Sequence, residues 1–221
     1  MSNTTFDLNG FIAESKEILL NPKSHFSNLK TTGGLVEPLI KAVIYGVVAG
    51  AIAFIWGLLG LGAVSGGLFG GAIGVMALIW YIVAAIVGLF IGAVILLVIS
   101  SICKGNTDFE ANTRVVASAM VMMPVSALLT FTSGISLWLG SIIMLAVNIF
   151  TLYLLYHGLV ETLKAKAETS RLVLYILTGL LVLFMLLGMG ARKRVDRIMN
   201  DYDQQDLQEM LDDLREEADD Q

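Results

Sequence analysis

Long apolar runs separated by short charged segments dominate the pattern of the chain. The longest run extends from Ala42 to Cys103 and contains no Asp, Glu, Lys, Arg or His. Because a helix that crosses the hydrocarbon core of a bilayer needs about 20 apolar residues, this run holds two spanning helices, or three. Shorter apolar runs follow the charged segments later in the chain. The pattern predicts five membrane-spanning helices, over about residues 39–61, 75–102, 112–132, 136–159 and 171–190.

These runs predict helices rather than strands. A transmembrane barrel is built from strands of about ten residues in which apolar and polar positions alternate, and the runs of this chain do not alternate. In hydrocarbon the backbone groups must be hydrogen-bonded within helices or within a closed barrel. The predicted fold class is therefore all-α: a polytopic membrane bundle of five helices, with six as the alternative, over residues 38–192.

A glycine-rich stretch from Gly57 to Gly74 decides between five and six spans. Glycine weakens a helix by about 1 kcal/mol per position relative to alanine, which favours a link between the first two spans that dips into the bilayer. The alternative is a further helix, because glycines spaced by four residues would give it a smooth face for packing against a neighbour. The glycines with this spacing are Gly62, Gly66, Gly70 and Gly74.

The segment before the first span, residues 1–37, carries apolar positions at helical spacing. Residues 7–20 predict a short amphipathic helix, which either packs on the membrane domain or lies in the interface of the bilayer. Asn21 and Pro22 favour the end of this helix and the start of another turn, with Asn21 as its cap. Lys41, one turn into the first span, is expected to extend its amine to the lipid headgroups.

The segment after the last span, residues 193–221, is acidic and amphipathic. From Val195 to Gln221 it has eleven acidic residues against Arg197 and Arg215. Its apolar residues recur at helical spacing on this charged background. We interpret the tail as one or two soluble helices, and as the place where a protein partner or a second copy of the chain binds.

Lysine and arginine residues near the helix ends indicate the orientation, because they are enriched on the cytoplasmic side. Four of them precede or begin the first span, two lie between the second and third, three between the fourth and fifth, and five after the last. With a cytoplasmic N-terminus, five spans and six spans both place nine of them inside and five outside. The count favours that orientation without choosing between the topologies, although the cluster of Arg192, Lys193 and Arg194 at a helix end favours six.

The amino-acid composition argues against several classes of function. The mean hydropathy is +0.78 and 15% of the residues are charged, against about 25% in soluble domains. With Cys103 as its one cysteine, the chain has no internal disulfide and no cysteine-rich metal site. Two histidines, His25 and His157, are too few for a metal centre, and the chain lacks a basic nucleic-acid face and catalytic motifs. The sequence therefore predicts no enzyme activity, no cofactor and no nucleic-acid partner.

A few residues in or beside the predicted spans carry candidate chemistry. Pro124 removes a backbone hydrogen bond and is expected to kink the third helix. Asn148 is polar at membrane depth, and His157 and Glu161, four residues apart, are expected to hydrogen-bond on one helix face. Thr107 and Glu110 have the spacing of a capping box at the start of the third helix. Packing, rather than soft-metal binding, is the interpretation of four methionines: Met120, Met122, Met123 and Met144.

Several motifs resemble the Yip (Ypt-interacting-protein) domain family in its bacterial form. The stretch ILLNPKSHFSNLK, with Pro22 and Phe26, resembles the segment that precedes the first helix of that family. KGNTDFEANTRVVASAMVMMPVSAL resembles the start and the proline of its third helix, and YLLYHGLVETLKAKAETSRLVLYIL resembles its fourth helix and the link to the fifth. The resemblance covers about residues 15–190. It implies five membrane helices, a cytoplasmic N-terminus and a Gly-rich exit from the first helix.

Eukaryotic members of this family bind Rab-type GTPases in vesicle traffic and carry an acidic DLYGP stretch. In this chain Asp7 and Leu8 are followed by Asn9 and Gly10, so the trafficking role is not carried over. We expect a non-enzymatic protein of the bacterial inner (plasma) membrane, an adaptor or membrane-organising subunit in contact with the lipid bilayer and with a protein partner or a second copy. The alternative is a transporter or channel for a small solute that uses the interrupted helices.

Overall fold

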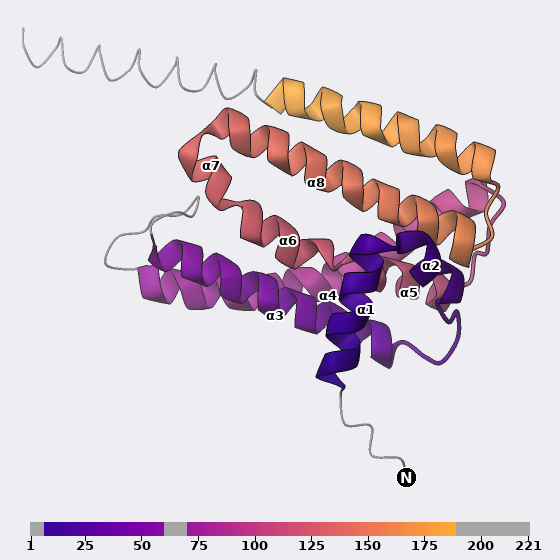
Figure 1. Cartoon of the computed structure of the whole chain (residues 1–221), viewed down its shortest axis with the longest axis horizontal. Helices are drawn as coiled ribbons and strands as arrows, with labels where there is room; N and C mark the ends of the chain where they lie inside the picture. Colours follow the sequence, from indigo (N-terminus) through magenta and orange to yellow (C-terminus); the bar gives the residue numbers. More distant parts are fainter. Residues whose placement is uncertain (1–6, 60–69, 189–221) are drawn as a thin grey trace, which may run out of the picture. The chain divides into compact units, whose positions relative to one another are not determined.

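The computed structural model describes residues 7–59 and 70–188, and helices are the only regular secondary structure in these residues (Figure 1). Five helical segments are long and apolar enough to cross a membrane, which confirms the predicted all-α class and its five spans. By contacts the chain divides into two compact units, residues 1–178 and 179–221, and packing is described below for the first. The five segments are Val36–Leu58, Leu78–Ile102, Phe109–Ile135, Trp138–Thr162 and Ala167–Gly188.

Two short helices, α1 (Leu8–Leu20) and α2 (Pro22–Asn28), precede the first span. Pro22 begins α2, where its missing N–H leaves no hydrogen bond unmade. The expected cap at Asn21 is wrong, since its side chain bonds to none of the described residues of α2. Asn21 also ends α1 and donates its backbone N–H to Glu17, so the end of the first helix sets its conformation. Ile18 and Phe26 are fully buried, and both helices therefore pack on the membrane domain.

The first two spans, α3 (Val36–Leu58) and α4 (Gly70–Ile102), form a close antiparallel pair (Figure 1). Gly46 lies against Ala85, and Gly50, one turn further along α3, lies against Leu78. A Cβ atom added to Gly46 would come within 2.8 Å of the Ala85 Cβ. Small residues four positions apart allow two membrane helices to approach this closely.

The glycine-rich stretch separates these two helices but is only in part a link. Gly70 and Gly74 lie inside α4, so the prediction of a link up to residue 74 is wrong for them. Hydrocarbon favours helical hydrogen bonding strongly enough to offset the low helix propensity of glycine. Gly62 and Gly66 fall outside the described residues. Residues 59–69, which separate α3 from α4, are fewer than the about 20 that a span needs, and α3 and α4 take up the rest of the stretch that the alternative assigned to a sixth helix.

The third span is broken into α5 (Phe109–Ala119), α6 (Met122–Leu129) and α7 (Phe131–Ile135). Pro124 lies in the first turn of α6, where it cannot donate to the Met120 carbonyl and its ring crowds that group. The predicted capping box is wrong by one residue, because the side chain of Asp108 accepts the N–H of Ala111 instead. Glu110 then points elsewhere and binds Arg114 and Gly34. The third span is also the most buried, with 56% of its most apolar window inside the protein.

The fourth span consists of α8 (Leu137–His157) and a π-helical turn, η2 (Gly158–Thr162). The backbone of the link after η2 pairs with the link after α4. Asn106 donates its N–H to Leu163 at 2.7 Å, and Lys166 donates to Cys103 at 2.9 Å. The helix α2 contacts η2, so α2 and both links lie at one end of the bundle. The last helix, Ala167–Gly188, follows.

Candidate functional site

A cluster of six ionisable residues, the polar cap, joins α1 and α2 to the first and third spans. Its members are Glu14, His25, Glu37, Lys41, Glu110 and Arg114. Lys41 is only 8% exposed. Its Nζ lies 2.6 Å from Glu14 Oε1 and 3.0 Å from Glu37 Oε1. The expectation that Lys41 reaches the lipid headgroups is therefore wrong, because α1 covers it and supplies a carboxylate.

Arg114, at the centre of the polar cap, is 4% exposed. Its Nη1 lies 2.9 Å from Glu37 Oε2, and its Nε lies 3.0 Å from Glu110 Oε1. Its Nη2 donates to the Gly34 carbonyl at 2.9 Å, while the Gly34 N–H donates to Glu110. The guanidinium thus ties the turn before α3 to α5. A buried charge is tolerated when it is paired and hydrogen-bonded in this way.

His25 of α2 closes the polar cap from the other side. Its Nε2 lies 3.2 Å from Ser118 Oγ on α5 and 3.9 Å from Glu14 Oε1. Burial lowers the pKa of His25 below its ordinary value, although the neighbouring carboxylate of Glu14 opposes this shift. The histidine is therefore neutral near pH 7, and it positions α2 on the bundle. Thr162 of η2 holds the same helix by donating its hydroxyl to the Phe26 carbonyl at 2.6 Å.

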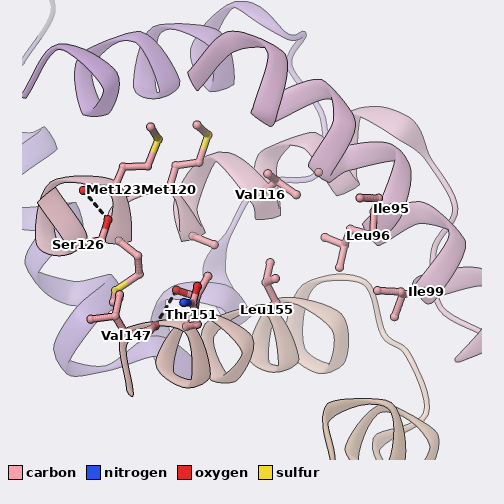
Figure 2. Close-up of a pocket in the computed structure, with 14 residues that line it drawn as sticks. Ile95, Leu96, Ile99, Val116, Met120, Met123, Ser126, Val147, Thr151 and Leu155 are labelled. Carbon is pink, nitrogen blue, oxygen red and sulfur yellow. Dashed lines mark hydrogen bonds between the residues drawn. The ribbon is translucent and has the colours of Figure 1, made fainter. Parts of the chain in front are cut away.

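A second feature, the intramembrane groove, lies at membrane depth between α4 and α8. It is partly open, has a volume of about 420 Å³, and has α5 and α6 as its floor at the break of the third span. Figure 2 shows that Leu96 of α4 and Leu155 of α8 point toward the same space. Three polar residues in the lining donate to carbonyls of their own helices: Ser126 to Met123, Asn148 to Met144, and Thr151 to Val147.

The groove and the polar cap bring some of the candidate residues together and leave others apart. Asn148 lines the groove with Met120, Met122 and Met123. The expected bond between His157 and Glu161 is wrong. Neither ring nitrogen of His157 has a hydrogen-bond partner among the described residues, and Glu161 accepts from Ser27 instead. The π-turn after His157 changes the angular spacing of the helix, so a four-residue separation no longer places two side chains on one face.

Pro22 and Phe26 lie at the polar cap end, where Phe26 packs at 5.1 Å from the ring of His25. The cluster of Arg192, Lys193 and Arg194 and the acidic tail fall outside the described residues. The sequence analysis did not use two spacing patterns that correspond to contacts in the structure. The pairs Glu37–Lys41 and Glu110–Arg114 have the four-residue spacing of helical ion pairs, and Gly46 and Gly50 have the spacing of close helix packing. Both signals are visible in the printed sequence.

The charged groups of the polar cap are paired with one another across helices. Its carboxylates all accept hydrogen bonds: Glu14 from Lys41, Glu37 from Arg114, and Glu110 from Arg114 and Gly34. In residues 7–59 and 70–188 no group of three or more His, Cys, Asp or Glu side chains is placed to hold a metal ion. What the arrangement achieves is a fixed attachment of α1 and α2 to the membrane helices.

Five spans, an N-terminal pair of helices locked by ion pairs and a groove at membrane depth define a polytopic α-helical membrane protein. The model of the Yip1 domain family matches residues 16–189. The chain belongs to this family, and the resemblance seen in its motifs is confirmed. No curated protein and no solved structure matches the chain.

Proposed function

We propose that the protein is a non-enzymatic adaptor or membrane-organising subunit of the bacterial inner membrane, with its N-terminus in the cytoplasm. The observation that carries the proposal is the fixed position of α1 together with the apolar side chains that it leaves uncovered. Leu8 and Ile12 are 58% and 56% exposed, on a helix whose Ile18 is fully buried. A helix anchored on one face and apolar on another is suited to hold a partner protein against the membrane surface.

The ion pairs of the polar cap support this proposal. Lys41 binds Glu14 of α1, and the hydroxyl of Ser15 lies 2.8 Å from that of Tyr45 on α3. These bonds fix the rotation of α1 about its own axis, so that Leu8 and Ile12 are presented on a constant face. A partner that binds a preorganised surface avoids the entropy loss of ordering it.

The acidic tail is the second contact that we assign to the adaptor, on the basis of its sequence. Its eleven acidic residues against two arginines favour a partner with a basic surface, and such charge complementarity raises the association rate. With five spans and a cytoplasmic N-terminus, the tail belongs on the outer side of the membrane. The two contacts would then engage partners on opposite sides of the bilayer.

The experiment compares cross-linked complexes in cells that produce the full chain, a variant that lacks residues 195–221, and a variant in which the tail acids are Asn or Gln. We expect both variants to lose the partners held by the tail and to keep those held by α1. A Leu8→Ser, Ile12→Ser double variant should show the reverse. Retention of every partner in all three variants would contradict the adaptor function, provided that the unfolding midpoints are unchanged.

The groove beside the broken third span is the one observation that favours the alternative of a solute transporter. Interrupted helices and polar groups near the midplane build transport sites, and Asn148 lines this groove. The alternative predicts solute flux into vesicles that contain the protein and loss of flux in Asn148→Leu. The adaptor function predicts no flux in either protein.

A further inference from the structure

We propose that the intramembrane groove binds one acyl chain of an anionic membrane phospholipid, and that Lys104, Lys166 and Arg171, the cationic rim, hold its headgroup. The groove is an apolar space of about 420 Å³ at a depth where hydrocarbon chains are its surroundings. An empty space of this size would leave its lining without dispersion contacts. The lining is apolar except for Ser126, Asn148 and Thr151, and each of these donates a hydrogen bond to its own helix, so the chemistry of the groove suits an alkyl chain better than a polar solute.

A second, smaller cavity lies beside the groove, toward the end of the bundle that carries the polar cap. It has a volume of about 30 Å³ and shares three lining residues with the groove, Leu96, Ile99 and Leu155. Tyr156 and Ser170 also line this cavity. The small cavity therefore adjoins the groove, and its lining includes Leu159 and Ser170, which flank the link over residues 163–166.

Ser170, in the lining of the small cavity, supplies an observation that points to a ligand. Its side chain is 1% exposed, and its Oγ has no hydrogen-bond partner among the described residues. A buried hydroxyl without a partner is unfavourable. An ester carbonyl of a phospholipid, which lies between the acyl chain and the phosphate, would accept this hydrogen bond. The position of Ser170, in a small cavity between the apolar groove and the cationic rim, matches that order of groups.

Cationic side chains lie where the phosphate would follow. Arg171 is next to Ser170, and its Nε donates to the hydroxyl of Tyr156 at 3.1 Å. Lys166 and Lys104 are brought to the same end because the backbone of Lys166 donates to Cys103. All three side chains are exposed, and Asp108 and Glu168 are exposed acids close to them in the sequence. This charge favours an anionic headgroup over a zwitterionic one.

The test uses the full chain in phosphatidylcholine vesicles with a minority of phosphatidylglycerol that carries a diazirine at the end of one acyl chain. After illumination, mass spectrometry locates the adducts. We expect adducts at Met120, Met123 and Thr151 in excess over those around Ile142, an exposed residue of α8 outside the groove. The substitution Thr151→Phe fills the groove and should reduce its labelling to the level around Ile142, whereas Ile142→Phe should not.

The rim is tested by Arg171→Gln, which keeps a polar side chain on an exposed position. Loss of one cation near the headgroup should reduce the preference for the phosphatidylglycerol probe over a phosphatidylcholine probe by about fivefold. If Thr151→Phe fails to fold, Arg171→Gln still tests whether an anionic phospholipid binds. The proposal is overturned if groove labelling is no greater than labelling around Ile142, or if the preference survives Arg171→Gln. Cross-links between two copies through the groove residues, or stronger labelling without residues 195–221, would assign the space to another occupant.

Discussion

The polar cap and the intramembrane groove lie in one bundle and share the third span, but they are packed in opposite ways. In the polar cap, Arg114 and Lys41 are buried and each of their charged groups has a carboxylate within 3.0 Å. In the groove, apolar side chains of α4 and α8 face a space that no described side chain fills. Charge near the membrane surface must be paired before it can be buried, whereas hydrocarbon-facing surface is stable against lipid and needs no protein partner.

This difference separates the parts of the molecule that hold it together from those that can take a ligand. The polar cap links α1, α2, α3 and α5, so that changes there should affect the whole bundle. The groove lies at the break between α5 and α6, where side chains of the lining border an open space. Substitutions of similar size should therefore have unequal effects on stability in the two regions.

The largest effect is expected from Arg114→Met, with Lys104→Met as its control. The variant leaves Glu110 and the Gly34 carbonyl without their cation, and we expect a loss of about 3 kcal/mol in the free energy of unfolding. Lys104 is exposed, so its replacement should change stability by less than about 0.5 kcal/mol. Unfolding followed by circular dichroism in detergent micelles measures both. Equal effects would show that the polar cap carries no special stability.

A somewhat smaller loss is expected from Gly46→Leu in the seam between α3 and α4. The added side chain would clash with Ala85 and the Tyr81 carbonyl, at a cost of about 2 kcal/mol. Gly88 of α4 is the matched control, because an added Cβ there meets no described atom within 4 Å. Gly88→Leu should be nearly neutral in the same unfolding experiment. A neutral Gly46→Leu would mean that the two helices are not packed closely.

Acidification should weaken the attachment of α2, by less than either substitution. Burial lowers the pKa of His25 in the folded state, so the unfolded chain binds its proton more readily. The stabilisation is complete above the unfolded-state pKa of about 6.5 and is lost as the pH falls through the folded-state value. Glu14 and Glu17 oppose this effect, while Lys41 adds to it. The protection factors of the α2 amides, which correct for the slower intrinsic hydrogen exchange at acid pH, should therefore fall on acidification in the wild type, and His25→Gln should remove that change.

The smallest effect is expected from Ser170→Ala beside the groove. Removal of a buried hydroxyl without a partner should leave the protein as stable as before, or more stable by up to about 1 kcal/mol, in lipid-free detergent. In phosphatidylglycerol vesicles this gain should disappear, because the wild-type hydroxyl then has a lipid partner. If Ser170→Ala gained the same stability in detergent and in vesicles, the Ser170 hydroxyl would have no lipid partner, and the groove would not differ from the polar cap in taking a ligand.

The number of spans could be predicted because the thickness of the bilayer sets the length of each apolar run. The ion pairs within one helix, such as Glu37–Lys41, were also within reach, since their spacing alone places them together. The pairing of Lys41 with Glu14 was not, because it depends on how α1 folds back over the bundle.

The groove could not be predicted from the sequence either. Its shape depends on the gap that α4, α8 and the broken third span leave, and no pattern of residues encodes such a gap. Two candidate residues from the sequence, Pro124 and Asn148, do lie on helices that border the groove, so the sequence indicated part of its position. The hydrophobic pattern did not predict the π-turn at Gly158–Thr162, which changes the relative positions of His157 and Glu161.

The proposed adaptor function places the polar cap and the acidic tail on opposite sides of the membrane. Labelling of single cysteines from outside intact cells tests this placement most directly. In a Cys103→Ser background, the reporter positions are Ser65 in the glycine-rich stretch, Lys164 beside the polar cap, and Gln221 at the end of the tail. Five spans with a cytoplasmic N-terminus predict that an impermeant reagent labels Ser65→Cys and Gln221→Cys but not Lys164→Cys. Labelling of Ser65→Cys without Gln221→Cys, or of Lys164→Cys, would contradict the account.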